Sequence, residues 1–321
     1  MKALKIFIIF VAALFVADRG IAFVMNKIYD LSMIGQTGGK INYYLKKKQL
    51  PDVLIMGDSR AFYLVNPDSF KTVTAFNIAH AGMDQCFQNG LFSVLLHKKK
   101  LPKKILLHIE PNFYLTNSDG KKFVSTDIQQ LKYYYGEDEL VTKYINELGT
   151  FEWMKYLFHS YKYNGRLVNT LINSYATRKT PKATGNGYES NGVTKLDSLH
   201  TEYSAEHSKL KKYPLNRSTT RYIEEFLKMA TANSIEVSCF TSPTYYKMAI
   251  SNYAPAQQYL DSLFAANKIK YIDYERHNPA DTRYRDAHYW KDADHLNGNG
   301  AKFFSAQIEK DFFTTTTSTE K

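Results

Sequence analysis

The sequence has few cysteines, and they are not arranged as a site. Cys86 and Cys239 are the two among 321 residues. The first stands at the start of an expected helix and the second inside an apolar strand. Because neither belongs to a metal-type pair, both are interpreted as core residues. A disulfide between them stays open as an alternative, and two cysteines do not fix the redox compartment.

The chain also lacks a basic arm and an internal repeat. Its formal net charge is +11, but lysines and arginines are dispersed, and the clearest runs are residues 46–48 and 98–100. The second run follows an expected helix, whose dipole such cations complement, so nucleic acid is not expected as a partner. With 44% hydrophobic and 23% charged residues, the composition is that of a folded protein. One α/β domain with an insertion fits the length, and two small domains are the alternative.

The N-terminus carries an apolar run long enough to span a membrane. Lys2 and Lys5 precede residues 6–25, which the pair Asp18-Arg19 interrupts. About 20 residues cross a bilayer, and lysines before the run favour a cytoplasmic N-terminus. No small-x-small cleavage site followed by polar residues is evident. Residues 1–26 are therefore predicted to be an uncleaved signal anchor, with a cleaved signal peptide as the alternative.

Downstream, short apolar strands alternate with helices of ten or more residues. The predicted strands are residues 53–56, 73–78, 105–109, 235–241 and 269–273. The predicted helices cover about 84–99, 218–233, 255–267 and 300–312. This alternation indicates an α/β fold of three layers, α/β/α, in which helices cover both faces of a mainly parallel sheet.

Three other segments complete the expected organisation. Residues 27–50 form a connector, and residues 51–313 form the α/β domain, with a helical subdomain inserted at about 113–215. Tyrosines are scattered along this insertion. A helical core is the commoner use of such aromatic side chains, and stacking on sugar rings is the alternative. The Thr-rich tail, 314–321, is predicted to be disordered.

Polar residues at the ends of the predicted strands suit acyl-transfer chemistry. Ser59 follows the first strand, Gly82 the second and Asn112 the third, while Asp292 and His295 precede the last helix. Parallel sheets keep their active sites at the edge where these loops emerge. A serine nucleophile needs a base, an acid that orients the base, and donors for an oxyanion. With two residues between them, the aspartate and the histidine fit a single turn that leaves one imidazole nitrogen facing the serine.

These residues resemble the SGNH hydrolase superfamily, also called the GDSL family. Gly57-Asp58-Ser59, Gly82 within residues 77–82, and Asp292-x-x-His295 are similar to its first, second and last blocks. The third block departs from the pattern, because Glu110-Pro111-Asn112 stands where the family usually has Gly-x-Asn-Asp. The resemblance covers most of the chain after the anchor, and it implies a flavodoxin-like arrangement of the sheet.

The resemblance assigns roles residue by residue. It implies that Ser59 is the nucleophile, that His295 is the base, and that Asp292 orients this base. Gly82 and Asn112 would donate to the oxyanion, the second with less support because its block departs from the pattern. No metal and no cofactor is implied.

Several neighbouring residues have two interpretations. Asp294 is the alternative orienting acid, although its adjacency to the histidine gives it poorer geometry. Arg60 either helps to hold an anionic substrate or forms a local ion pair. His80 and His108 are interpreted as structural. A metal site made of His288 with the aspartates and the histidine of the last loop lacks a recognised ligand spacing.

The anchor, the Gly-Asp-Ser-Arg block close behind it and the terminal Asp-x-x-His-Leu-Asn block resemble a membrane-anchored branch that modifies cell-surface polymers. It includes the alginate O-acetylation proteins and the D-alanine transfer protein of teichoic acid synthesis, whose partners are membrane-bound O-acyltransferases. The resemblance implies a single-pass protein of the bacterial cytoplasmic membrane with a periplasmic O-acyltransferase domain that transfers acetyl groups to a polysaccharide. A carbohydrate esterase of the same fold and a non-catalytic carbohydrate-binding scaffold subunit are the alternatives. Transferase and hydrolase share every residue named here.

Overall fold

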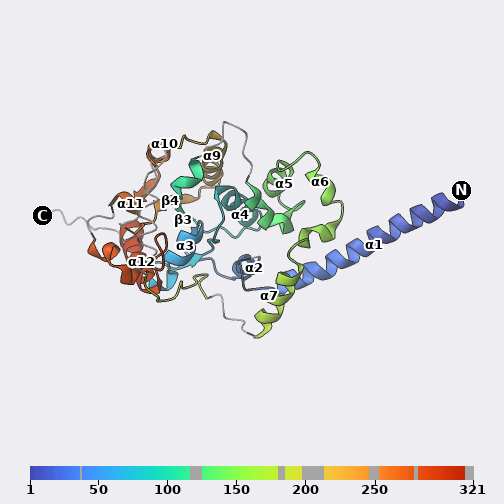
Figure 1. Cartoon of the computed structure of the whole chain (residues 1–321), viewed down its shortest axis with the longest axis horizontal. Coiled ribbons are helices and arrows are strands. Elements are labelled where there is room, and N and C mark those ends of the chain that lie inside the picture. Colours follow the sequence, from blue (N-terminus) through green and yellow to red (C-terminus); the bar gives the residue numbers. More distant parts are fainter. Residues whose placement is uncertain are drawn as a thin grey trace. The chain divides into compact units, whose positions relative to one another are not determined.

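A computed structural model gives the fold of the chain (Figure 1) and describes residues 1–36, 38–115, 125–179, 185–196, 213–245, 253–277 and 281–314. The chain divides into two compact units. The helical unit comprises Met1–Lys48, Gly90–Lys100 and Val124–Thr184, and the sheet unit comprises Gln49–Asn89, Leu101–Phe123 and Gly185–Lys321. Beyond residue 314, the tail expected to be disordered lies outside the described residues.

The sheet unit is built on a parallel sheet. Its described strands are β1 (Val53–Met56), β2 (Ala75–Asn77), β3 (Lys104–His108), β4 (Glu236–Thr241) and β5 (Lys270–Asp273). They lie in the order β2-β1-β3-β4-β5, and every pairing is parallel. In register, β1 places Val53 between Ala75 and Lys104. The predicted sheet is confirmed, and its strand order reverses at β1, where open α/β sheets bind their ligands.

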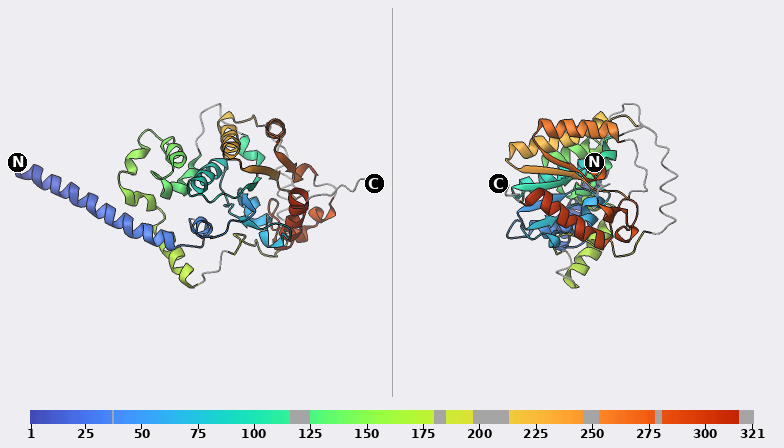
Figure 2. Two further views of the ribbon diagram at one scale, coloured as in Figure 1. Left: turned by 180° about the vertical axis from the view of Figure 1, so that it is seen from behind. Right: turned by 90° about the vertical axis from the view of Figure 1, so that its left-hand side faces the viewer.

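Helices cover both faces of this sheet. The longer ones in this unit are α3 (Ser59–Leu64), α9 (Arg217–Ala232), α10 (Ala254–Ala266) and α12 (Gly298–Phe313), whereas α4 (Gln85–His97) begins in the sheet unit and belongs to the helical unit from Gly90 onward. Figure 2 shows α9 and α10 on one side of the sheet and α12 on the other, and α12 packs against α3. The shorter elements are η1 (Pro67–Ser69), η2 (Pro111–Tyr114), α11 (Tyr274–His277), η6 (Thr282–Arg285) and η7 (Ala287–Tyr289). The three-layer α/β/α architecture is therefore confirmed.

The core of the sheet unit lies between the sheet and the layer that holds α3 and α12. All four residues of β1 are buried, and Phe304 of α12 packs on Phe240 of β4 with 6.1 Å between ring centroids. Cys86 and Cys239 are free and buried, as expected of core residues. Burial of this apolar layer is the main force that fixes α12, and thereby the loop before it, over the strand ends.

The helical unit contains α1 (Lys2–Leu31), α2 (Gly39–Leu45), η3 (Thr126–Tyr134), α5 (Glu139–Asn146), α6 (Glu152–Lys155), η4 (His159–Tyr163) and α7 (Leu167–Lys179). Here α1 packs against η4 and α7. Tyr29 of α1 stacks on Tyr133 at 3.8 Å and meets Tyr163 edge-on at 6.3 Å. These tyrosines thus serve the helical core, which is the commoner of the two uses considered for them.

In the described part of the chain, α1 is the one helix long and apolar enough to cross a membrane, a property that signal sequences share. It continues to Leu31, beyond residue 26 and into the segment expected to be a connector. That segment also forms α2. The end of α1 is held by packing, since Met25 and Tyr29 are each only 5% exposed.

Candidate active site

Ser59 is the first residue of α3, where β1 turns into the helix. Gly57, between the strand and the serine, has a φ of +143°, and a Cβ there would lie 2.6 Å from the Cβ of His108. Glycine is therefore needed for the chain to turn so close to β3. Asp58 caps the helix, because its carboxylate accepts the N–H of Arg60 at 2.9 Å. The serine is thereby fixed at the carboxyl edge of the sheet.

His295 and Asp292 meet Ser59 in the arrangement that their spacing predicts. The Nε2 of His295 lies 2.8 Å from Ser59 Oγ, and its Nδ1 lies 2.9 and 3.1 Å from the two carboxylate oxygens of Asp292. The same carboxylate accepts the backbone N–H of His295 at 2.8 Å. These are hydrogen-bond distances. The serine, imidazole and carboxylate thus form one continuous relay, which is the set of groups that nucleophilic acyl transfer requires.

The loop that carries this pair, residues 290–297, is anchored in the core. Trp290 and Leu296 form an antiparallel bridge, and both are fully buried. The indole N–H of Trp290 donates to the carbonyl of Tyr284 at 3.1 Å, and Asn297 caps α12 with its side-chain oxygen. Two buried side chains and a helix cap therefore hold the histidine in place before any substrate binds.

Electrostatics distinguish the two aspartates of this loop. Burial alone would raise the pKa of Asp292, but the hydrogen bond and charge of His295, together with two backbone N–H groups, lower it. Burial raises the pKa of Asp294, which the charge of Arg60 opposes and that of Glu110 reinforces. Asp292 is thus the carboxylate that is both ionised and bound to the imidazole. The alternative acid at position 294 is not brought onto the ring.

Tyr63 is a site residue that the sequence analysis missed. It lies one helical turn after Ser59, and its ring packs edge-on against His295, with centroids 5.8 Å apart and planes at 88°. Burial raises the pKa of Tyr63, so the phenol stays neutral beside the imidazole. The signal was available, because residues four apart share one face of a helix.

Arg60 forms the local ion pair that was one of its two interpretations. The residue is 4% exposed, and its Nη1 lies 2.6 Å from Glu110 Oε2. Its Nη2 donates to the carbonyls of Ser242 and Pro243 at 3.3 and 3.1 Å. The guanidinium therefore links the ends of β1, β3 and β4, as the local ion pair predicts, and a part for Arg60 in substrate binding stays a prediction. The acid of the divergent third block is its partner.

Gly82 and Asn112 lie at the ends expected of them. Gly82 follows β2 with a φ of +74°, and a Cβ there would meet nothing within 4 Å, so conformation and not space calls for glycine. Asn112 lies in η2, and its Nδ2 donates to Tyr253 Oη at 3.1 Å. Their roles as oxyanion donors stay predictions.

A second Asp-His-Ser relay starts from the residue before the serine. Asp58 Oδ1 lies 3.0 Å from His108 Nδ1, and His108 Nε2 lies 3.1 Å from Ser242 Oγ. Burial opposes ionisation of Asp58, but His108 lowers its pKa overall. Ser242 is fully buried and His108 is 3% exposed, so no substrate reaches them. This relay joins strand ends, and His80, bonded through Nδ1 to the carbonyl of Ile78 at 2.8 Å, is similarly used within the fold.

Within the described residues, no group of three or more His, Cys, Asp or Glu side chains is placed to hold a metal ion. His288, which was weighed as a ligand, lies 2.7 Å from Asp286. It is therefore paired outside the Asp292–His295 turn.

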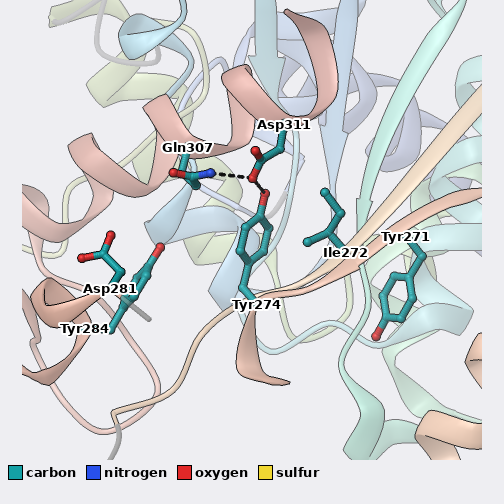
Figure 3. Close-up of a pocket in the computed structure, with 7 residues that line it drawn as sticks. All are labelled: Tyr271, Ile272, Tyr274, Asp281, Tyr284, Gln307 and Asp311. Atoms are coloured by element: carbon teal, nitrogen blue, oxygen red, sulfur yellow. Dashed lines mark hydrogen bonds between the residues drawn. The ribbon is translucent and has the colours of Figure 1, made fainter. Parts of the chain in front are cut away.

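A cavity of about 460 Å³ lies elsewhere in the sheet unit, beside the edge strand β5 (Figure 3). Its lining residues are Tyr271, Ile272, Tyr274, Asp281, Tyr284, Gln307 and Asp311. Tyr274 and Gln307 both donate to Asp311, at 2.8 and 2.7 Å. None of the lining residues belongs to the Ser59 relay, so the cavity is separate from the candidate active site.

Comparison with known proteins finds similarity only to solved structures, three of which follow. No protein-family model and no curated protein matches the chain. A protein from Bacteroides fragilis provisionally named an acylhydrolase is 14% identical, with a TM-score of 0.39 over 84% of this chain and 92% of that one. A GDSL-like lipase from Bacteroides thetaiotaomicron is 13% identical, with a TM-score of 0.36 over 81% and 86%. A Streptococcus pneumoniae protein provisionally named a platelet activating factor is 13% identical, with a TM-score of 0.37 over 96% and 98%.

Proposed function

We propose that the protein is an extracytoplasmic serine enzyme that transfers acyl groups, acetyl above all, through an acyl-serine intermediate to a hydroxyl of an exported or cell-surface polysaccharide. The observation that carries this proposal is the continuous relay from Asp292 through His295 to Ser59. A half-buried serine with an imidazole 2.8 Å from its oxygen is equipped to attack a carbonyl, because proton removal and attack can occur together.

In the first half of the reaction, Ser59 Oγ attacks the carbonyl carbon of the acyl donor. His295 Nε2 takes the hydroxyl proton, and the Asp292 carboxylate stabilises the imidazolium through Nδ1–H. The tetrahedral intermediate then expels the donor's alkoxide, which receives the proton from Nε2. In the second half, an acceptor hydroxyl gives its proton to Nε2 and attacks the acyl-serine. The new ester leaves, and the serine recovers its proton.

The oxyanion needs donors that are fixed before the reaction. The N–H of Ser59 is one, because the first N–H groups of a helix have no acceptor within the helix. The N–H of Gly82, in the turn after β2, is the second donor in this proposal, and the Asn112 amide would join if it left Tyr253. The roles of Gly82 and Asn112 are those that the resemblance to the SGNH hydrolase superfamily implies.

Water competes with the sugar as the acceptor. The Asp292 side chain is 43% exposed and that of His295 is 21% exposed, so the site is open to solvent as it stands. This exposure favours measurable hydrolysis of activated esters even if a sugar is the natural acceptor. A carbohydrate esterase is accordingly the second candidate function, served by the same three residues.

Location and partners extend the proposal. Lys2 and Lys5, which precede the apolar run at the start of α1, favour a cytoplasmic N-terminus and a periplasmic catalytic part, in a single-pass protein of the bacterial cytoplasmic membrane. Retention of α1 is supported by Tyr29, which is buried against Tyr133, since cleavage after the apolar run would separate this tyrosine from its helix. A membrane-bound O-acyltransferase is the proposed acyl supplier.

The test is Ser59→Ala against Ser242→Ala. With p-nitrophenyl acetate as the substrate, we expect Ser59→Ala to lower kcat/KM by about 10³-fold or more, because the nucleophile is lost. A fluorophosphonate should label the wild type and Ser242→Ala but not Ser59→Ala. Unchanged turnover in Ser59→Ala would refute the serine mechanism. Binding of polysaccharide without any labelling of the wild type would instead favour the scaffold subunit.

A further inference from the structure

The helical unit exposes apolar side chains that a water-soluble surface would bury. Outside α1, the exposed large apolar residues of the described chain fall within residues 151–175, apart from Met1, Leu50 and Val193. The stretch around α6 presents Phe151, Trp153, Met154, Leu157 and Phe158, each between 44% and 69% exposed. A continuous apolar patch of this kind marks an interaction surface.

The helix α7 is inverted in polarity. An outward stripe is apolar, with Val168, Ile172 and Tyr175 at 64%, 56% and 61% exposure, while Thr170 and Ser174 on the inner side are 2% and 5% exposed. A helix on the surface of a soluble protein has the opposite arrangement. The outer stripe of α7 is therefore suited to an apolar medium.

The polar pair in the middle of α1 is satisfied by this same part of the chain. Asp18 is 5% exposed and accepts the backbone N–H groups of His159 and Ser160 at 2.8 and 2.9 Å. Arg19 pairs with Asp18 at 2.6 Å and donates to the carbonyl of Leu157 at 3.2 Å. Such pairing is what allows charged side chains within a bilayer.

The length of α1 decides how deep these contacts lie. The first ring contact along α1 is Phe15 against Phe158, with centroids 5.5 Å apart, and the N-terminal half of the helix projects away from α6 and α7 (Figures 1 and 2). Residues 2–14 rise only about 20 Å at 1.5 Å per residue, whereas the hydrocarbon layer is about 30 Å thick. Tilting the helix reduces the thickness that it covers. If α1 spans the bilayer, at least about 10 Å of the hydrocarbon must therefore surround α1 where Phe158 and η4 pack on it.

We infer that the helical unit is partly embedded in the outer leaflet of the membrane, with the apolar residues around α6 and the outward stripe of α7 in contact with lipid. This surface, the membrane platform, consists of Phe151, Trp153, Met154, Leu157 and Phe158 together with the outward face of α7. This inference rests on the anchor of the proposed function and is independent of its chemistry. Both α1 and the platform would then bind the protein to the membrane.

The chemistry of the platform fits a lipid surface. Trp153 and Tyr175 are the amphipathic aromatic residues that gather at membrane interfaces. A cavity of about 620 Å³ opens beside the platform and is lined by apolar side chains such as Ile21, Met25 and Leu167, with Lys155 among its polar residues. An acyl chain fits such apolar walls, and the Lys155 ammonium at the cavity is already paired with Glu152.

The experiment uses the full chain in liposomes of phosphatidylcholine and phosphatidylglycerol that contain brominated acyl chains. Bromine quenches tryptophan only by close contact, and the chain has two tryptophans. Trp290 is fully buried, whereas Trp153 is 48% exposed. We expect bromines near the headgroup end of the chains to quench the wild-type emission more strongly than bromines near the bilayer centre.

Two variants show which tryptophan the bromines quench. Trp153→Phe, which retains only Trp290, should lose the quenching, and Trp153→Phe/Tyr175→Trp should regain it on α7. Absence of quenching in the wild type and in this double variant would overturn the platform. If Trp153 were shielded from aqueous iodide only in native membranes and not in pure lipid, the surface would bind a membrane protein, and the lipid assignment would be wrong.

The anchor is tested separately by alkaline carbonate extraction. Retention in the membrane with no quenching would refute the platform alone. Release of the protein by carbonate would refute the spanning helix on which the depth argument rests. Ester hydrolysis by Ser59 is measured on the same samples, and its loss would concern only the proposed chemistry.

Discussion

Replacement of Asp292 tests the relay most directly, because a second carboxylate two residues away provides the control. In Asp292→Asn the amide oxygen should stay at the Oδ1 position, since the N–H groups of Asp294 and His295 donate to that atom at 2.9 and 2.8 Å. The Nδ1–H of the imidazole keeps an acceptor there, at 2.9 Å. The tautomer is therefore retained, and what is lost is the negative charge that stabilises the imidazolium.

The size of the loss follows from exposure. Loss of a fully buried triad aspartate, with the wrong tautomer, costs about 10⁴ in kcat. Asp292 is 43% exposed, so water screens its charge and the asparagine still orients the ring. We expect kcat/KM for p-nitrophenyl acetate to fall about 10²-fold in Asp292→Asn, or about 3 kcal/mol of barrier, and about 10³-fold in Asp292→Ala, which also loses the hydrogen bond.

Asp294→Asn is the matched control. The raised pKa of Asp294 brings its carboxyl closer to the neutral state that asparagine imitates, and its side chain is not the one bonded to the imidazole. We expect kcat/KM to stay within about threefold of the wild type, a small change in the barrier. A larger loss in Asp294→Asn than in Asp292→Asn, or an Asp292→Ala variant within tenfold of the wild type, would refute the assignment of the orienting acid.

Two stability predictions concern the support of the site. Gly57→Ala should destabilise the protein by about 2–5 kcal/mol, because a strained φ adds to a clash with His108. Gly82→Ala has open space around it and should cost only the strain of its φ. Equal midpoints of urea unfolding for the two variants would contradict this prediction. Burial raises the pKa of Glu275 to about 7, with Arg60 opposing the shift. Because the folded-state pKa lies above the unfolded one, Glu275 should cost stability as the pH rises from about 4.5 to 7, by up to about 3 kcal/mol. Glu275→Gln should remove this loss, and parallel stability curves for the two proteins against pH would count against it.

The sequence was informative wherever a local pattern is sufficient. The strands were predicted from short apolar runs. The predicted helices that flank the sheet lie within a few residues of their observed bounds, because periodicity and caps such as Asp84 act within one turn. The relay was also predictable in part, since two residues between Asp292 and His295 allow one turn to join them. Tyr63 was missed although its spacing from the serine was available.

Other features depended on contacts between distant segments. The ion pair of Arg60 with Glu110 needed β1 and β3 as neighbours, and the buried pairing of His108 with Ser242 needed β4 beside them. The inverted polarity of α7 can be recognised only when it is known which of its residues are buried. The expected insertion at about 113–215 was inferred from a break in the alternation of strands and helices, whereas the helical unit takes in residues 124–184 together with residues 1–48 and 90–100.

The sequence by itself determined the parallel α/β sheet, the candidate serine with its Asp-x-x-His partner and the apolar N-terminal helix, because each is written in residues close along the chain. Only the tertiary structure decided that His295 reaches Ser59, that the guanidinium of Arg60 is buried and paired with Glu110, and that α1 enters the core of the helical unit. The physical reason is the same in each case. Burial, pairing and depth are properties of what surrounds a side chain, and here the surroundings come from segments more than 40 residues away.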